Sequence, residues 1–309
     1  MLGSSTAAAV TDAFATASGR LWYVANTDGH LHAVAPDGTD TDIGALQDAG
    51  RSSQNYLTGL AVSPDGRNWA WGVTTPGSPG TAATTRIEVG GAGGPTRNAL
   101  SEPASPGGEP GPVLAPLAWT SRGLLVSRNE TGIGGCCYLW PETGGRDVML
   151  VDPTTFAVVK TWTGCQTKFV SVAGSFACAA STVVVHQAAL SDVQVAALPP
   201  VAGLGWLVVD DVQRRVLFAV IHDRGAGGGD GPYVIDTEQG DLVSGVVTKL
   251  YDQTTPLAIL PAGRAVTAAA PAVPGLGQGY PLSIRSSSGA SVQIGPRDAQ
   301  FIAAFQMAG

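Results

Sequence analysis

Four cysteines are the residues of this chain best suited to covalent chemistry. They are Cys136, Cys137, Cys165 and Cys178, and none of them forms the Cys-x-x-Cys spacing that is typical of thiolate metal sites. An even, clustered set of cysteines in a chain with only three lysines favours disulfides and an oxidising compartment. We therefore predict an extracytoplasmic protein, whether secreted, periplasmic or on the cell surface.

The positions of the cysteines suggest how they pair. The neighbours Cys136 and Cys137 rarely bond each other, because that geometry is strained. We therefore expect at least one disulfide from Cys136 or Cys137 to Cys165 or Cys178. Cys165 is the favoured partner, since it lies directly before the next predicted strand. Such a bond would staple residues 129–146 to the following repeat.

The segment at 129–146 also carries a cluster of large side chains, namely Tyr138, Leu139 and Trp140. Aromatic side chains on a stapled loop are typical of protein or glycan recognition. The alternative is that they fold back over a neighbouring sheet as a lid. We predict that these three residues form a binding loop.

Histidine and aspartate offer two further candidate sites for a metal. His30 and His32 alternate on a predicted strand, so they share a face and could hold a metal, but the motif supplies no third ligand. Asp223 and Asp230 flank a glycine-rich run that could bind Ca²⁺ through oxygen atoms, but it lacks the spacing of known calcium loops. We expect solvent-facing histidines, an exposed loop and no cofactor.

The sequence contains no recognisable catalytic motif. Gly-x-Ser-x-Gly is absent, and the glycine-rich run is not followed by Gly-Lys-Ser/Thr. Asp210 is the one clear carboxylate on the predicted inner strands. The net charge of −7 and the absence of a basic cluster argue against nucleic acid as a partner. No catalytic residue and no metal ligand is therefore assigned.

The strongest structural signal is a predicted hairpin at residues 57–72. Its first strand is apolar, and its second carries Trp69 and Trp71 on one face. The turn between them, Ser63-Pro64-Asp65-Gly66, contains an Asp-Gly pair, and glycine accepts the positive φ that tight hairpins need. We predict that both indoles pack between adjacent sheets.

This hairpin resembles the repeat of TolB-like and related WD40-type β-propellers, where Ser-Pro-Asp-Gly joins the first two strands of a blade. The resemblance implies blades of four antiparallel strands, and patterns of this kind recur along the chain. Five units begin, in order, at residues 57, 116, 168, 205 and 256.

The two ends of the chain supply a sixth unit in this scheme. We predict that Ala299–Gln306 gives one strand and lies beside Gly19–Asn26, the first of three N-terminal strands. The expected fold is an all-β, six-bladed propeller with this 1+3 closure; the alternative is seven blades. Residues 1–18 are predicted to be a disordered or linker segment, and residues 19–309 a single domain.

Composition agrees with a turn-rich all-β protein. Hydrophobic residues make up 44% of the chain and charged residues 13%, with 42 glycines and 21 prolines. No stretch approaches the ~18 apolar residues of a transmembrane helix. We predict a non-catalytic propeller that binds a protein or glycan, as a subunit of a larger surface assembly or alone. The alternative is a propeller-fold hydrolase or lyase with an active site at the central axis.

Overall fold

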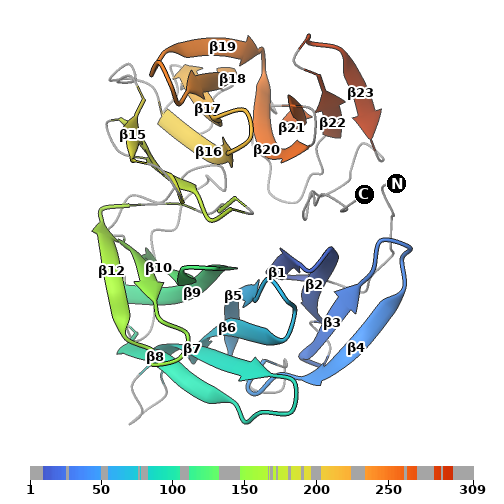
Figure 1. Ribbon diagram of the computed structural model, residues 1–309, viewed down its shortest axis with the longest axis vertical. Helices are drawn as coiled ribbons and strands as arrows, with labels where there is room; N and C mark the ends of the chain where they lie inside the picture. The colour runs from blue at the N-terminus through green and yellow to red at the C-terminus, as the bar shows by residue number, and fades with distance from the viewer. Residues whose placement is uncertain are drawn as a thin grey trace. The chain divides into compact units, whose positions relative to one another are not determined.

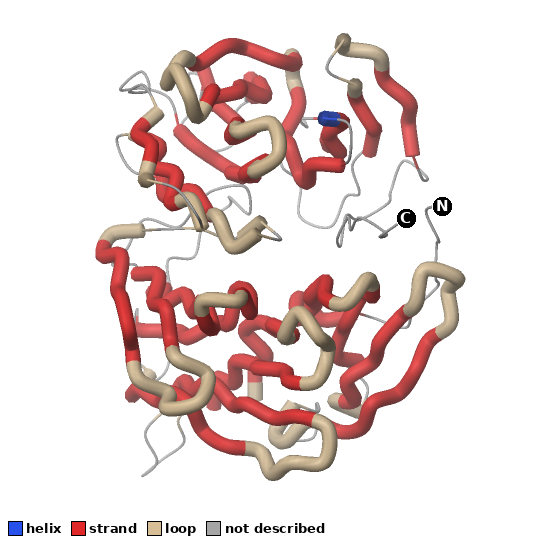
Figure 2. Tube along the Cα trace, in the orientation of Figure 1, coloured by secondary structure: helices blue, strands red, loops and turns tan. Residues whose placement is uncertain are grey.

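Strands are the main element of the computed structural model, as Figure 2 shows, and they pair in antiparallel fashion. It describes residues 10–25, 28–49, 55–75, 77, 83–104, 111–131, 147–165, 167, 170–171, 173–179, 182–188, 191–195, 203–223, 234–260, 263–269, 282–286 and 288–294. Among these residues there is no helix long and apolar enough to cross a bilayer.

The strands form six sheets, each built from strands that are consecutive in the chain. We call them blades 1 to 6. The predicted all-β fold of a six-bladed β-propeller is confirmed, and the seven-bladed alternative is not. The chain divides into two compact units, of which unit 1 contains blades 1–3 and unit 2 contains blades 4–6.

Unit 1 contains three four-stranded sheets, drawn from blue to green in Figure 1. Blade 1 consists of β1 (Val10–Ala17), β2 (Arg20–Ala25), β3 (His30–Val34) and β4 (Asp40–Ala45); blade 2 of β5 (Tyr56–Val62), β6 (Asn68–Thr75), β7 (Thr84–Gly91) and β8 (Arg97–Pro103); and blade 3 of β9 (Gly111–Thr120), β10 (Gly123–Thr131), β11 (Asp147–Val151) and β12 (Val158–Thr163).

Unit 2 contains one three-stranded and two four-stranded sheets. Blade 4 consists of β13 (Phe176–Ala179), β14 (Val183–His186) and β15 (Val193–Gln194); blade 5 of β16 (Gly203–Asp210), β17 (Arg215–Asp223), β18 (Val234–Asp241) and β19 (Val247–Tyr251); and blade 6 of β20 (Thr254–Leu260), β21 (Arg264–Ala269), β22 (Leu282–Arg285) and β23 (Ser291–Ile294). The inner strand predicted for blade 4 is represented among the described residues by an isolated bridge from Val170 to Phe176.

The first blade corrects two predictions about the ends of the chain. Residues Val10–Ala17 form strand β1 and pair with β2, where a linker was expected. β1 therefore occupies the position beside residues 20–25 that was predicted for Ala299–Gln306, and residues 299–306 lie outside the described part of the chain. The physical reason is a tight turn: Ser18 and Gly19 both have positive φ, the pattern that two-residue hairpin turns require.

The predicted hairpin of blade 2 forms as expected. Leu60 pairs with Trp71 and Val62 with Trp69, so both indoles lie on one face of β6. Trp71 is buried and Trp69 is partly buried, and both pack in a cluster that also contains Trp22 of blade 1. The prediction that the two rings pack between adjacent sheets is confirmed.

The turn of this hairpin is closed by its own side chains. The Ser63 hydroxyl donates to an Asp65 carboxylate oxygen at 2.6 Å, and the Arg67 backbone N–H donates to the same oxygen at 3.1 Å. Gly66 follows with φ +72°, a conformation that favours glycine. The Ser-Pro-Asp-Gly sequence therefore folds the turn through local hydrogen bonds and one glycine.

Blades 2 and 3 approach closely at a pair of glycines. Gly59 of β5 pairs with Gly72 of β6. A Cβ added to Gly59 would lie 2.8 Å from the Pro116 carbonyl oxygen, and one added to Gly72 would lie 2.8 Å from the Leu114 carbonyl oxygen, both on β9. The absence of side chains at these two positions is what lets the two sheets pack at this distance.

Candidate functional site

The predicted binding loop joins two well-defined strands of blade 3. β10 ends at Thr131 and β11 begins at Asp147, and Arg128 pairs with Asp147 at the base of the connection. Arg128 also donates to Glu102 of blade 2 at 2.8 Å. Tyr138, Leu139, Trp140, Cys136 and Cys137 lie outside the described residues.

The outer strand of the same blade carries an exposed apolar surface. β12 is the edge strand of its sheet, and Val158 and Val159 are 46% and 63% exposed. Lys160 and Thr161 are exposed as well. The Lys160 ammonium lies 4.5 Å from the centre of the Trp162 ring. We call Val158–Thr163 the β12 edge.

The corresponding strand of blade 1 is different. β4 is also an outer edge strand, but it carries Asp40 and Asp42. Charged side chains on an edge oppose pairing with another chain, because pairing would take the charges out of water. The β12 edge carries one charge, that of Lys160, beside its two valines.

The cysteines form a disulfide, but between other partners than predicted. Cys165 is bonded to Cys178, with their Cα atoms 4.8 Å apart. The prediction that Cys165 or Cys178 bonds Cys136 or Cys137 is therefore wrong. Cys165 follows the end of β12 by two residues and Cys178 lies in β13, so a short connection of thirteen residues brings them together. The predicted pairing took Cys136 and Cys137 to be the partners of Cys165 and Cys178. It did not consider a bond between Cys165 and Cys178 themselves.

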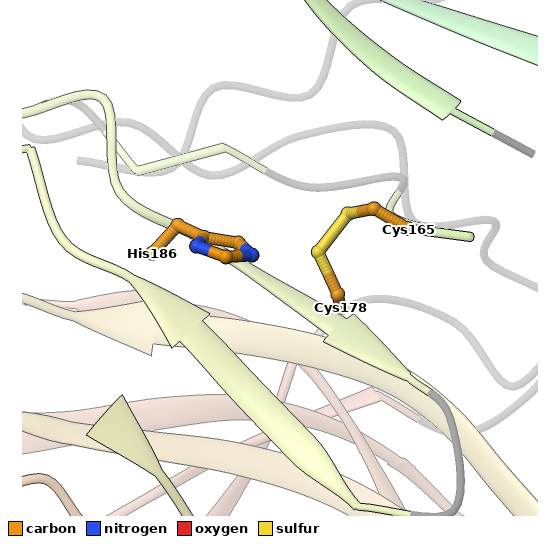
Figure 3. Close-up of side chains that lie close together, drawn as sticks. All are labelled: Cys165, Cys178 and His186. Carbon is orange, nitrogen blue, oxygen red and sulfur yellow. A yellow bond between two sulfur atoms is a disulfide. The ribbon is translucent and has the colours of Figure 1, made fainter. Parts of the chain in front are cut away.

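A histidine lies beside the disulfide. One ligand atom of His186 and the two sulfur atoms of Cys165 and Cys178 all lie within 4.8 Å of one another. Figure 3 shows the edge of the imidazole ring pointing toward the two sulfurs. Among the described residues, this is the one group of three histidine, cysteine or carboxylate side chains close enough to share a metal ion.

The hairpin of β13 and β14 explains this arrangement. Phe176 pairs with His186 and Cys178 pairs with Val184, so Cys178 and His186 are diagonal neighbours on one face of the sheet. The opposite face carries Ala177 and Val185, which pack into the core shared with blade 5. The alternation of the strand thus separates an apolar face from a face that presents sulfur and imidazole.

A carboxylate and an aromatic ring hold His186 in place. Its Nδ1 lies 2.9 Å from an Asp192 carboxylate oxygen, and the Phe176 ring lies 5.1 Å from the imidazole, centre to centre. The His186 side chain is 14% exposed, whereas that of Asp192 is 51% exposed. The cluster is therefore largely buried and opens to solvent on the Asp192 side.

The predicted histidine pair on β3 contacts carboxylates. His30 Nδ1 lies 2.9 Å from Asp42, and His32 Nδ1 lies 3.2 Å from Asp40. The solvent-facing position expected for both residues is only partly correct, since their side chains are 34% and 18% exposed. Both histidines therefore pair with carboxylates of the neighbouring strand β4.

Tyr23 extends this polar cluster of blade 1. Its ring stacks on His32 at 4.9 Å, and its hydroxyl donates to Asp40 at 2.7 Å. Burial, followed by the hydrogen bond to Asp40, raises the pKa of Tyr23 to about 12. The phenol thus remains a proton donor across the physiological range, which suits a structural link between β2 and β4.

Asp210, the carboxylate noted on the predicted inner strands, has a structural position. It accepts hydrogen bonds from the backbone N–H groups of Val212 and Gln213, each at 3.1 Å, and pairs with Arg215 at 3.2 Å. Arg215 in turn donates to the Gly263 carbonyl oxygen of blade 6 at 2.8 Å. These contacts close a turn and join two blades. Asp223 lies at the end of β17, and residues 224–233, including Asp230, lie outside the described residues.

Comparisons with known proteins give the fold and little more. No family model matches the sequence, and no curated protein matches it. Solved structures do match. An acylaminoacyl peptidase from Pyrococcus horikoshii superposes with a TM-score of 0.52 and 11% identity, over 93% of this chain and 46% of that one.

Two further matches have lower TM-scores. A prolyl endopeptidase matches at 0.46 with 14% identity, over 91% of this chain and 49% of that one. A catalytically inactive virginiamycin B lyase from Staphylococcus aureus matches at 0.47 with 11% identity, over 92% and 82%. The chain spans about half the length of the two peptidases.

Proposed function

We propose that this protein is a non-catalytic, extracytoplasmic propeller that binds a protein partner through blade 3, alone or as a subunit of a larger surface assembly. The observation that carries the proposal is the β12 edge, an edge strand on which the consecutive residues Val158 and Val159 are both exposed beside a register shift in the β11–β12 pairing. Exposed apolar side chains gathered on one element are typical of contact surfaces.

The connection between β10 and β11 of this blade adds to the proposal. It carries Tyr138, Leu139 and Trp140, and large aromatic residues contribute most to binding energy in protein interfaces. We infer that these three residues bind a protein partner as well. A glycan is the less favoured partner, since valine side chains offer no hydrogen bonds to sugar hydroxyls.

The extracytoplasmic location is supported by the Cys165–Cys178 disulfide, because disulfides persist mainly in oxidising compartments. Both cysteines are buried, at 3% and 6% exposure. Trapping of thiols in freshly lysed cells of the native source, followed by mass spectrometry, tests this directly. We expect the oxidised pair, and two freely alkylated thiols after unfolding would contradict an extracytoplasmic location.

The binding proposal is tested with a photo-crosslinking residue placed at position 159 and, as a matched control, at position 43. Val159 and Ile43 are exposed apolar residues on the outer strands β12 and β4. In extracts of the native source we expect a defined protein adduct from position 159 and none from position 43.

A second set of variants makes the result specific. Val158→Lys together with Val159→Lys should abolish the adduct formed by a crosslinker at position 161 on the same strand. Thr41→Lys together with Ile43→Lys, on β4, should leave it unchanged. Equal adducts from all variants, or capture of a glycan in place of a protein, would overturn the proposal.

A further inference from the structure

We propose that Cys165, Cys178 and His186 form a redox-gated zinc site, which is closed while the disulfide is intact and opens when it is reduced. In the oxidised protein the two sulfurs are bonded to each other and one His186 nitrogen lies within 4.8 Å of both. Cysteine binds metals as a thiolate, so the disulfide blocks two of the three ligands.

Reduction supplies the missing ligands in a balanced step. A dithiol reductant transfers two electrons and two protons to the sulfur–sulfur bond, becomes a disulfide itself and leaves two cysteine thiols. Binding of Zn²⁺ then displaces the two thiol protons to solvent. The product is a site with two thiolates and one imidazole around the ion, the set that zinc takes in open, three-ligand sites.

The distances around the cluster suit zinc. With zinc–sulfur bonds of about 2.3 Å, tetrahedral thiolates lie about 3.8 Å apart, so the sulfurs must separate after the bond breaks. Cys165 follows β12 and Cys178 lies within β13, so of the two cysteines Cys165 is the one outside a strand. Together the thiolates and imidazole favour a thiophilic ion over Ca²⁺ or Mg²⁺.

Asp192 completes the arrangement. Its carboxylate lies 2.9 Å from His186 Nδ1, which leaves Nε2 as the nitrogen that binds the ion. A carboxylate behind a metal-binding histidine orients the ring and makes it a stronger ligand.

The test uses the full chain with Cys136→Ser and Cys137→Ser, so that Cys165 and Cys178 are its only cysteines. Zn²⁺ binding is measured by competition with a chromophoric chelator under anaerobic conditions. The reductant is a water-soluble phosphine, which takes oxygen from water to become a phosphine oxide and leaves two thiols. We expect no bound zinc before reduction and one equivalent after it, with β-sheet circular dichroism retained.

Variants separate the proposed site from two thiols acting alone. In the reduced protein, Asp192→Asn should weaken zinc binding about tenfold, and His186→Ala should weaken it further. His30→Ala, which alters a histidine of blade 1, should change nothing. Co²⁺ in place of zinc should give a thiolate charge-transfer band and the visible bands of tetrahedral cobalt, the latter altered by His186→Ala.

Three results would overturn the proposal: zinc bound equally before and after reduction, zinc affinity unchanged by His186→Ala, or loss of the β-sheet signal on reduction. The last would show that the thiols are released only by unfolding. Because every measurement uses zinc or cobalt and the isolated protein, the outcome does not depend on the partner proposed for blade 3.

Discussion

Trp69 and Trp71 leave β6 on the same face but reach different depths. Trp71 is 1% exposed and its indole N–H donates to the Gln47 carbonyl oxygen at 3.1 Å, whereas Trp69 is only partly buried. We expect Trp71→Ala to lower the free energy of unfolding by about 3–5 kcal/mol, because a large buried ring leaves a cavity. Trp69→Ala should cost less. Urea unfolding curves measure the free energy of unfolding of both variants. An equal loss in the two would contradict the deeper burial of Trp71.

Aspartates cap four turns of the chain and give folding a pH dependence. The Ser63 hydroxyl for Asp65, and backbone N–H groups for Asp37, Asp152 and Asp241, hold the pKa of each carboxyl below its ordinary value. A depressed folded-state pKa contributes stability above the unfolded value of about 3.9, and that stability is lost as the pH falls through the folded-state pKa. We expect the melting temperature to fall as the pH drops below about 4.

Asparagine can make similar turn hydrogen bonds but does not titrate in this range. A protein with Asn at the four capping positions should therefore have a melting temperature that falls less between neutral and acid pH. Asp211→Asn removes a single carboxylate that is not one of these caps, and should leave the fall in melting temperature at acid pH as it is. An unchanged fall in melting temperature in the fourfold variant would show that other groups govern acid unfolding.

At the level of single residues, the sequence predicted turn residues better than it predicted which side chains lie next to each other. Asp65 and Gly66 could be placed because their hydrogen bonds and φ are local. The proximity of His186 to Cys178 was not predicted, although in the hairpin of β13 and β14 Cys178 pairs with Val184 and His186 lies diagonally across from it. The signal lies in the register of this hairpin, because the alternation of its strands puts Cys178 and His186 on one face.

Among the strands, β1 is the one that the sequence misplaced. Residues 10–17 alternate weakly and are rich in Ala and Thr, so the hydrophobic period was too faint to predict a strand. The Ser18-Gly19 turn decides the matter, because it pairs Ala17 with Arg20. Small side chains suit this position, since Ala15 and Ala17 pack against the cluster around Trp22.

Deleting residues 1–17 should therefore destabilise blade 1. The deletion exposes the edge of β2 and removes the Ala17 carbonyl that accepts the Trp22 indole N–H at 3.1 Å. We expect a clear drop in melting temperature and faster hydrogen exchange in residues 20–25. A deletion of 1–17 that melts like the full chain, with residues 20–25 still protected, would rule out a structural contribution from β1.

The close approach of blades 2 and 3 gives a second prediction at this scale. Gly72→Ala would place a methyl group against the Thr58 hydroxyl and 2.8 Å from the Leu114 carbonyl oxygen, so the Thr58 side chain and the neighbouring strand must shift. We expect a loss of about 1–3 kcal/mol in the free energy of unfolding. Gly94→Ala is the matched control, because a Cβ there meets nothing within 4 Å. Denaturant titration of both variants measures the difference, and equal stabilities would contradict the packing.

For the molecule as a whole, the number of blades was predictable because each repeat has a recognisable sequence pattern of a local turn and an alternating strand. What the sequence did not show is that neighbouring segments complete blade 1 and the disulfide: β1 directly precedes β2, and Cys165 lies thirteen residues before Cys178. The Cys165–Cys178 bond is the clearest case, as four cysteines allow three complete pairings and further partial ones.

This disulfide should stabilise the whole chain. Closing a connection of thirteen residues is worth about 3 kcal/mol in the chain-entropy model. Cys165→Ser with Cys178→Ser should lower the free energy of unfolding by about 2–3 kcal/mol. The melting temperature should fall accordingly, while the protein stays folded at 25 °C. Cys136→Ser with Cys137→Ser serves as the comparison in calorimetry. Identical melting of the Cys165/Cys178 variant and the unchanged protein would contradict a stabilising bond.

The order of the strands in blade 1 affects how the chain can fold while it is being synthesised. All four of its strands lie between Val10 and Ala45, and every other described sheet likewise uses consecutive strands. A chain emerging N-terminus first at roughly 5–20 residues per second can therefore pair each sheet as soon as its last strand has left the exit tunnel. Blade 1 need not hold an unpaired edge open until synthesis ends, which shortens the time during which nascent chains can associate with one another.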